Sequence, residues 1–185
     1  MSMLGIALLN EVTNNFDKNS ITASEILNKL RSNLIKSLHQ TGKFGETHDG
    51  MDIALCILDL SNSKLQFAGA HNPLYIIHKS SNQLTEIKAD RMPIGIYDEN
   101  EIPFTNNDLQ LSKGDYIYIF SDGFADQFGG VDHKKFLYKN LKQIMTEIAS
   151  FPVNEQKLKL DTCFENWKGE SEQIDDVTVL GLRIN

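Results

Sequence analysis

The run Ile117–Asp126 constrains this chain most, because a short block of β-branched and aromatic residues leads directly into Ser121-Asp122-Gly123. This pattern predicts a buried strand that ends in a carboxylate, where glycine lets the backbone turn sharply. A carboxylate fixed at a rigid strand end suits a metal site better than one on a flexible loop. The alternative is an ordinary Asp-Gly turn, since this dipeptide is common at turns.

Length and composition describe one globular domain with a core of its own. The chain has 185 residues, of which 41% are hydrophobic and 23% charged, with a formal net charge of −7. This acidity argues against nonspecific nucleic-acid binding, and no apolar run is long enough to cross a bilayer. Cys56 and Cys163 match no zinc-motif spacing, which is typical of reduced thiols in a cytoplasmic protein.

Hydrophobic periodicity predicts an α+β domain with a run of strands between two helix pairs. The predicted helices cover 1–13, 22–40, 133–149 and 154–168. Thr22-Ala-Ser-Glu25 is a capping-box pattern at the start of the second helix, and Asn154 is the expected N-cap of the last. The predicted strands cover 53–60, 64–70, 74–78, 83–87, 102–111, 116–121 and 175–184.

Three acidic positions share the feature that they lie at predicted strand ends. They are Asp52 before the first strand, Asp122-Gly123 after the central one, and Asp175-Asp176 at the start of the last. Mg²⁺ and Mn²⁺ prefer a few carboxylates and keep several waters, and two such ions can activate a bridging water for attack at phosphorus. Aspartate is also a normal turn residue, so the spacing alone leaves both interpretations open.

Four segments in order resemble the SpoIIE-like branch of the PPM-type, metal-dependent serine/threonine phosphatases. Ser121-Asp122-Gly123 resembles the (S/T)-D-G metal motif of that family, and Asp175-Asp176-Val177-Thr178 resembles its D-D-x-T motif. Ala68 to Tyr75 resembles the A-G-x-H-x-P segment, and Met92 to Ile96 the x-P-x-G segment. Together these similarities extend over nearly the whole chain.

The resemblance implies an α-β-β-α sandwich of two mainly antiparallel sheets, flanked by helix pairs, with two Mn²⁺ or Mg²⁺ ions at one edge. It implies hydrolysis of phosphoserine or phosphothreonine by a metal-activated water, without a phosphoenzyme. Asp122, with its Gly123 turn, and Asp175 would hold the metals, while Asp176 would either support these ligands or simply begin the strand. Asp52 is a further candidate ligand, while His71 is either a core histidine or a phosphate contact and proton donor.

The resemblance also implies a binding partner. The family's substrates include phosphorylated antagonists of anti-sigma factors, so a phosphorylated regulatory protein is the expected partner, with no nucleic acid and no membrane contact in this segment.

The chain differs from the family in one motif. No Asp-x-x-Gly-His-Gly occurs in it, although family members carry their principal bridging aspartate in that motif. We therefore expect residues 1–185 to form one domain that lacks its first strands, with an exposed sheet edge that favours a homodimer. A non-catalytic, pseudophosphatase module that binds a phosphoprotein is the alternative function.

Overall fold

The computed structural model describes residues 2–14, 21–41, 49–97 and 102–185. The chain divides into two compact units. Unit 1 comprises Met1–Pro73 and Lys88–Leu111, and unit 2 comprises Leu74–Ile87 and Ser112–Asn185. Each unit is an antiparallel sheet with a pair of helices on it, which confirms the predicted α+β class. Among the described residues, no helix has the length and hydrophobicity to cross a membrane.

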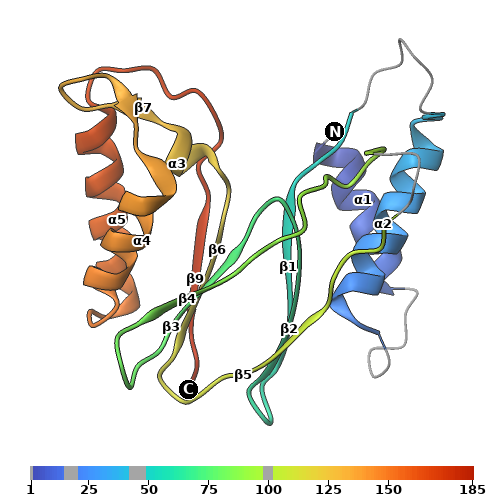
Figure 1. Ribbon diagram of the computed structural model, residues 1–185, viewed down its shortest axis with the longest axis horizontal. Coiled ribbons are helices and arrows are strands. Elements are labelled where there is room, and N and C mark those ends of the chain that lie inside the picture. The colour runs from blue at the N-terminus through green and yellow to red at the C-terminus, as the bar shows by residue number, and fades with distance from the viewer. Residues whose placement is uncertain (1, 15–20, 42–48, 98–101) are drawn as a thin grey trace. The chain divides into compact units, whose positions relative to one another are not determined.

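Unit 1 has a sheet in the order β1-β2-β5, and α1 and α2 lie on one face of it (Figure 1). Its elements are α1 (Ser2–Asn14), α2 (Ala23–Ser37), β1 (Ile53–Asp59), β2 (Lys64–Ala70) and β5 (Asn107–Gln110). The core is formed by fully buried leucines of α2 against small side chains of β2, among them Leu27, Leu30, Leu34, Ala68 and Ala70. Burial of this helix face supplies most of the stability of α2.

The N-terminus of α2 is formed by the predicted capping box. The Thr22 hydroxyl accepts from the Glu25 N–H, and the Glu25 carboxylate accepts from the Thr22 N–H at 2.8 Å. Both hydrogen bonds satisfy backbone donors that the helix itself leaves unpaired. The cap therefore fixes the residue at which the helix begins.

The β1–β2 hairpin brings the two predicted functional residues of unit 1 together. Its register pairs Ile53 with Ala70 and Asp59 with Lys64. Continued by one position, this register places Asp52 opposite His71 at the open end of the hairpin. The positions of these two side chains therefore follow from an ordinary antiparallel ladder.

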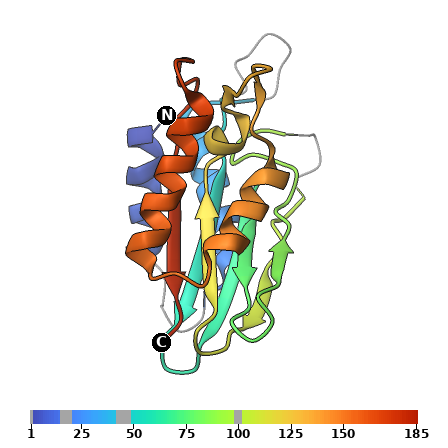
Figure 2. The ribbon, with the colours of Figure 1, turned by 90° about the vertical axis from the view of Figure 1, so that its left-hand side faces the viewer.

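Unit 2 has a sheet in the order β4-β3-β6-β9, with α4 and α5 packed across one face (Figure 2). Its strands are β3 (Leu74–Ile77), β4 (Leu84–Ile87), β6 (Tyr116–Phe120) and β9 (Val179–Arg183), with a small hairpin of β7 (Phe128–Gly129) and β8 (Lys134–Lys135). Its helices are α3 (Gly123–Asp126), α4 (Leu137–Ile148) and α5 (Val153–Lys168).

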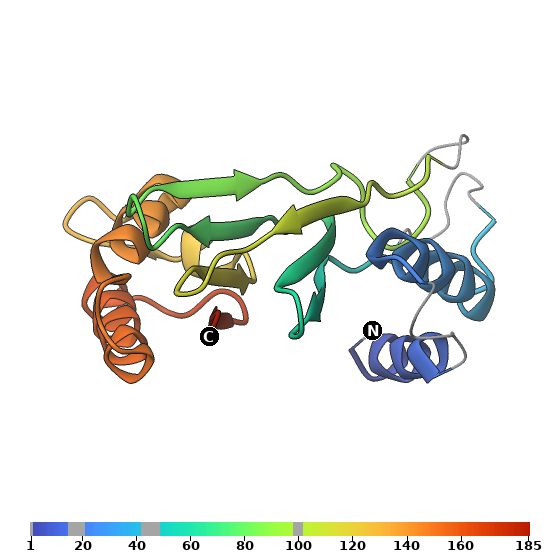
Figure 3. The ribbon, with the colours of Figure 1, turned by 90° about the horizontal axis from the view of Figure 1, so that it is seen from below.

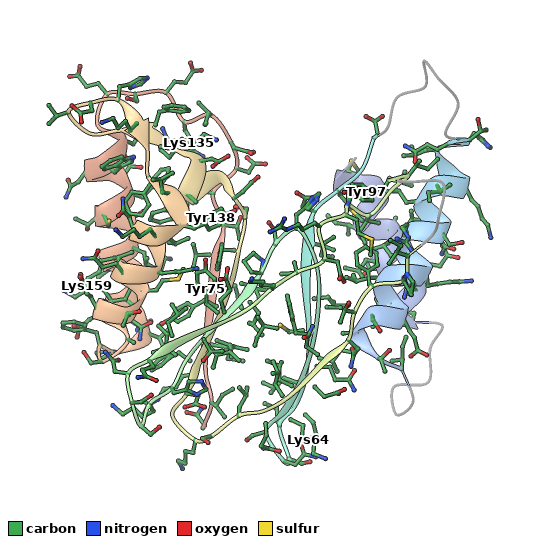
Figure 4. All side chains as sticks on the ribbon, in the orientation of Figure 1. Lys64, Tyr75, Tyr97, Lys135, Tyr138 and Lys159 are labelled. Carbon is green, nitrogen blue, oxygen red and sulfur yellow. The ribbon has the colours of Figure 1, made fainter. Side chains whose placement is uncertain are left out.

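Aromatic rings fill the space between this sheet and its helices. Tyr75 points from β3 toward α4 (Figure 4), and its ring centroid lies 4.7 Å from that of Phe120 on β6. Tyr118 on the same face is also buried. Alternate residues of β6 therefore face the helices, and the strand is held rigidly up to Phe120.

The structure corrects the predicted elements at several boundaries. Residues 102–106 are not a strand, because their backbone groups bond to side chains: the Phe104 N–H donates to Asn28, and the Ile102 carbonyl accepts from Arg31. Residues 133–136 are not helical: residue 133 lies in the turn between β7 and β8, residues 134–135 form β8, and α4 begins at Leu137. The N-cap of α5 is Pro152 rather than Asn154, and β9 begins at Val179 rather than at 175.

Candidate metal centre

The Ser121 side chain and backbone join the end of β6 to the loop before β9. The Ser121 N–H donates to the Thr178 carbonyl at 3.0 Å. Its hydroxyl donates to the Asp176 carbonyl at 2.8 Å and accepts from the Thr178 N–H at 2.9 Å. Three hydrogen bonds therefore bring two segments that lie far apart in the sequence into fixed contact (Figure 1).

Gly123 allows the same two segments to approach closely. A Cβ atom at this position would lie 2.5 Å from the Asp176 carbonyl oxygen and 3.3 Å from a methyl group of Val177. No side chain larger than hydrogen fits beside that carbonyl without a shift of the backbone. The glycine of the Ser-Asp-Gly run is thus required by close packing, in addition to its role in the turn.

A buried phenylalanine anchors the short helix that follows. The Phe124 ring lies edge-on to Phe136 and to Phe164, each with centroids 5.1 Å apart. Asp122 stands at the N-cap position of this helix in αR geometry and makes no side-chain capping bond there. The backbone that carries the half-buried Asp122 is therefore fixed by the packing of Phe124 and by the hydrogen bonds of Ser121.

Asp175 lies on the other joined segment. One of its carboxylate oxygens accepts from the Asp176 N–H at 2.7 Å, and its carbonyl accepts from the Gln173 amide at 2.8 Å. The preceding part of the loop is tied down by the buried Gln127, whose amide donates to the Glu172 carbonyl at 2.9 Å. The Asp175 side chain is exposed on an otherwise fixed loop.

The two carboxylates of unit 2 match the ions that the family resemblance implies. Asp122 and Asp175 supply hard carboxylate oxygens, which suit a Mg²⁺ or Mn²⁺ ion that keeps most of its waters. Within residues 2–14, 21–41, 49–97 and 102–185, no group of three or more histidines, cysteines or acidic residues forms a metal cluster. The described residues of unit 2 therefore offer a cation few protein ligands, which suits an ion that keeps most of its waters.

Asp52 and His71 form a separate pair in unit 1. The His71 Nδ1 atom lies 2.9 Å from an Asp52 carboxylate oxygen, and both side chains are more than a third exposed. His71 has a φ of 58°, and its backbone N–H donates to the Asp90 carbonyl at 3.0 Å. His71 is therefore held at the surface, not in the core, with one ring nitrogen engaged by Asp52.

Sequence reasoning missed two residues that shape the unit 2 site. Ser121 was identified only as part of a motif, although its hydroxyl bonds to Asp176 and Thr178 in the loop before β9. Gln127 gave no signal, because a glutamine after a short helix is usually solvated. Its buried position was detectable only from the packing of the 172–178 loop.

The profile of Stage II sporulation protein E (SpoIIE) matches residues 1–185 of this chain. The chain belongs to the SpoIIE family. Stage II sporulation protein E of Bacillus subtilis (strain 168) is 28% identical over 155 residues, which cover 83% of this chain and 17% of that protein. The chain thus spans less than a fifth of the length of this curated relative.

Solved structures give the same result for the fold. The SiaA-PP2C domain of Pseudomonas aeruginosa is similar with a TM-score of 0.83 and 25% identity, over 99% of this chain and 68% of that one. The catalytic domain of the serine/threonine protein phosphatase PstP, solved in complex with two manganese ions, is similar with a TM-score of 0.63 and 16% identity, over 96% and 77%. The SpoIIE-family chain therefore has the fold of PP2C-type protein phosphatase domains.

Proposed function

We propose that residues 1–185 act as one protein phosphatase domain, which hydrolyses phosphoserine or phosphothreonine on a regulatory protein with the help of Mn²⁺ or Mg²⁺. The observation that carries this proposal is the junction at Ser121, which holds the Asp122 and Asp175 loops together in a chain of the SpoIIE family. The presence of manganese in the related PstP domain supports the choice of ion.

Asp122 and Asp175 would hold the cation in this proposal. A divalent ion at that place lowers the pKa of water and neutralises charge at phosphorus. The contribution of the chain is to keep the two carboxylates in place on backbone that cannot relax, because Ser121 and Gly123 lock it. A site of this kind favours attack by water on the phosphoryl group, with release of the serine or threonine hydroxyl.

For His71 we keep the role that the family resemblance implies, a phosphate contact or a proton donor. Its Nδ1 atom is engaged by Asp52, which leaves Nε2 as the ring nitrogen available for such a contact. Asp52 then acts as a positioning residue that fixes the orientation of the ring. A direct role of Asp52 as a cation ligand stays a prediction, and its hydrogen bond to His71 favours the positioning role.

The proposed substrate is a phosphorylated regulatory protein of the kind that antagonises an anti-sigma factor. This assignment rests on family membership. We expect no nucleic-acid partner, because the net charge of −7 opposes binding to a polyanion.

Phosphate release from a phosphoserine protein in the presence of Mn²⁺ tests the proposal. Asp122→Asn keeps the size of the side chain but removes its charge, and we expect it to lower the rate about 100-fold or more. Asp132→Asn, an exposed acid in the β7–β8 turn, is the matched control and should retain the full rate. Hydrolysis that needs no metal, or equal rates for the two variants, would contradict the proposal.

A second candidate function is phosphoprotein binding without hydrolysis. The observation that favours it is that the described residues contain no group of three or more histidines, cysteines or acidic residues that could hold a metal ion. Two cations held close together without a bridging anion would repel each other. If wild-type protein binds the phosphoprotein but releases no phosphate at any Mn²⁺ concentration, this second function replaces the first.

A further inference from the structure

Gln127 is fully buried at the end of α3, and its side chain links two parts of unit 2. The amide nitrogen donates to the Phe128 carbonyl and to the Glu172 carbonyl, each at 2.9 Å. The first bond stays within the segment that follows α3, whereas the second crosses to the loop that carries Asp175. Gln127 therefore joins the segment after Asp122 to the Asp175 loop.

Two hydrogen bonds also fix the backbone of Gln127. Its carbonyl accepts from the Trp167 indole N–H at 3.0 Å and from the Phe136 N–H at 2.9 Å. Trp167 lies in the last turn of α5, and its own carbonyl accepts from the Gly130 N–H at 2.9 Å. No Cβ atom fits at Gly129, because it would overlap that same carbonyl oxygen. The Gln127 side chain thus extends from a rigid support.

The Asp175 loop leads from α5 back to β9, whose end is marked C in Figure 3. It is attached to the rest of unit 2 on both sides of Asp175. Ser121 bonds to the loop after Asp175, and Gln127 bonds to it before Asp175, at the Glu172 carbonyl. Residues 173–175 lie between these two attachments. The position of Asp175 therefore depends on both of them.

The side-chain oxygen of Gln127 argues against a role in stability alone. It is buried, and within the described residues it accepts no hydrogen bond. A buried acceptor without a donor lowers stability, so an apolar side chain of the same length would suit the packing as well or better. Natural proteins keep such costly groups mainly at functional sites. What the amide contributes here is its donors, one of which holds the Asp175 loop.

We propose that Gln127 is a positioning residue of the cation site, which acts by holding the loop at Glu172 so that the Asp175 carboxylate stays in place for the ion. This inference rests on the proposed function, because it takes Asp175 as a ligand of Mn²⁺ or Mg²⁺. Gln127 itself does not contact the ion. Loss of the groups that orient metal ligands typically weakens metal binding about 10- to 100-fold.

Gln127→Met separates a positioning role from a structural one. Methionine keeps the length of the side chain and removes both the donors and the unpaired oxygen. We expect the Mn²⁺ affinity, measured by calorimetry or electron paramagnetic resonance, to fall about tenfold, while the melting temperature stays within about 2 °C of wild type. Gln127→Leu, which also lacks a donor, should give the same pair of results.

Gln156→Met is the matched control. Gln156 is also buried in unit 2, but both ends of its amide have partners: the oxygen accepts from the Tyr118 hydroxyl, and the nitrogen donates to the Phe151 carbonyl at 2.8 Å. Methionine at this position leaves both partners unpaired, so the melting temperature should fall while the Mn²⁺ affinity matches wild type. The substitutions at Gln127 and Gln156 should therefore show opposite patterns.

Hydrogen exchange of the metal-free protein measures the loop directly. The backbone amides of residues 173–177 should exchange faster in Gln127→Met than in wild type, and at unchanged rates in Gln156→Met. Equal Mn²⁺ affinities for wild type and the Gln127 variants, or unchanged exchange of this loop, would overturn the inference and leave the proposed function intact.

Two further outcomes are decisive. A large loss of melting temperature in both Gln127 variants would overturn the positioning role, because the residue would then be needed for stability. Wild-type protein that binds no Mn²⁺ would overturn the proposed function, and this inference with it.

Discussion

The two candidate sites of this chain are held in different ways. In unit 2, the loops that carry Asp122 and Asp175 are joined by three hydrogen bonds of Ser121 and by the close approach at Gly123. In unit 1, Asp52 and His71 are exposed at the open end of a hairpin and share one hydrogen bond of 2.9 Å. Unit 2 thus fixes its carboxylates through the backbone, whereas unit 1 orients its imidazole through a side chain.

This difference indicates which of the two sites needs the tertiary packing around it to keep its geometry. A site built on locked backbone suits a cation, whose ligands must keep their positions. A pair joined by one exposed hydrogen bond contributes little to stability, typically below about 1 kcal/mol. Substitutions that disturb the junction of unit 2 should therefore lower the stability of the protein. Substitutions of Asp52 or His71 in unit 1 should change activity alone.

Gly123→Ala should give the largest effect on stability. Its methyl group would lie 2.5 Å from a backbone carbonyl, so the two loops must move apart at a cost of about 2 kcal/mol or more. Thermal unfolding followed by circular dichroism measures this loss. Gly5→Ala is the control, because its added Cβ meets only the flexible Met51 side chain. Equal melting temperatures for the two variants would show that the junction is not tight.

Asp52→Asn should have a smaller effect, confined to activity. If Asp52 only orients His71, the rate of phosphate release falls several-fold while the affinity for Mn²⁺ and the melting temperature stay constant. Rates measured across Mn²⁺ concentrations separate the two roles. A requirement for more Mn²⁺ in this variant would identify Asp52 as a cation ligand.

Thr22→Ala should give the smallest effect, limited to the stability of unit 1. Loss of the cap on α2 costs about 1 kcal/mol. The backbone and side-chain hydrogen bonds from Thr22 lower the pKa of Glu25. The contribution of this carboxylate is thus present above its unfolded pKa and is lost as the pH falls through its lowered folded pKa. Thermal unfolding at neutral and acidic pH should show a difference that narrows but does not vanish at low pH, because the bond from the Glu25 N–H to the Thr22 hydroxyl does not titrate.

Local patterns predicted most of the elements. The capping box at Thr22 and the alternation in β1 and β2 reside in contiguous residues, so the sequence alone was sufficient for them. Residues 102–106 were wrongly predicted as strand because their hydrogen bonds go to side chains of α2 and Asp90, far away in the sequence. The β7–β8 hairpin was missed because its strands are only two residues long.

The sequence was sufficient to single out the acidic residues of the candidate site, but not the contacts that hold their backbone in place. Asp122 and Asp175 were identified by predicted strand ends and by family motifs; Asp175 lies in the loop before β9, and both roles as ligands stay predictions. The contact of Gly123 with the Asp176 carbonyl, and the hydrogen bonds of Ser121, arise only when β6 and the loop before β9 meet. Such contacts depend on tertiary packing, which no local pattern encodes.

Titration of the metal-free chain with Mn²⁺, followed by calorimetry or by electron paramagnetic resonance, tests the central claim most directly. We expect wild type to bind Mn²⁺, Asp122→Asn to lose at least tenfold in affinity, and the control Asp132→Asn to match wild type. Equal affinities for wild type and Asp122→Asn, or no binding by wild type, would contradict a cation site at the junction of β6 and the loop before β9.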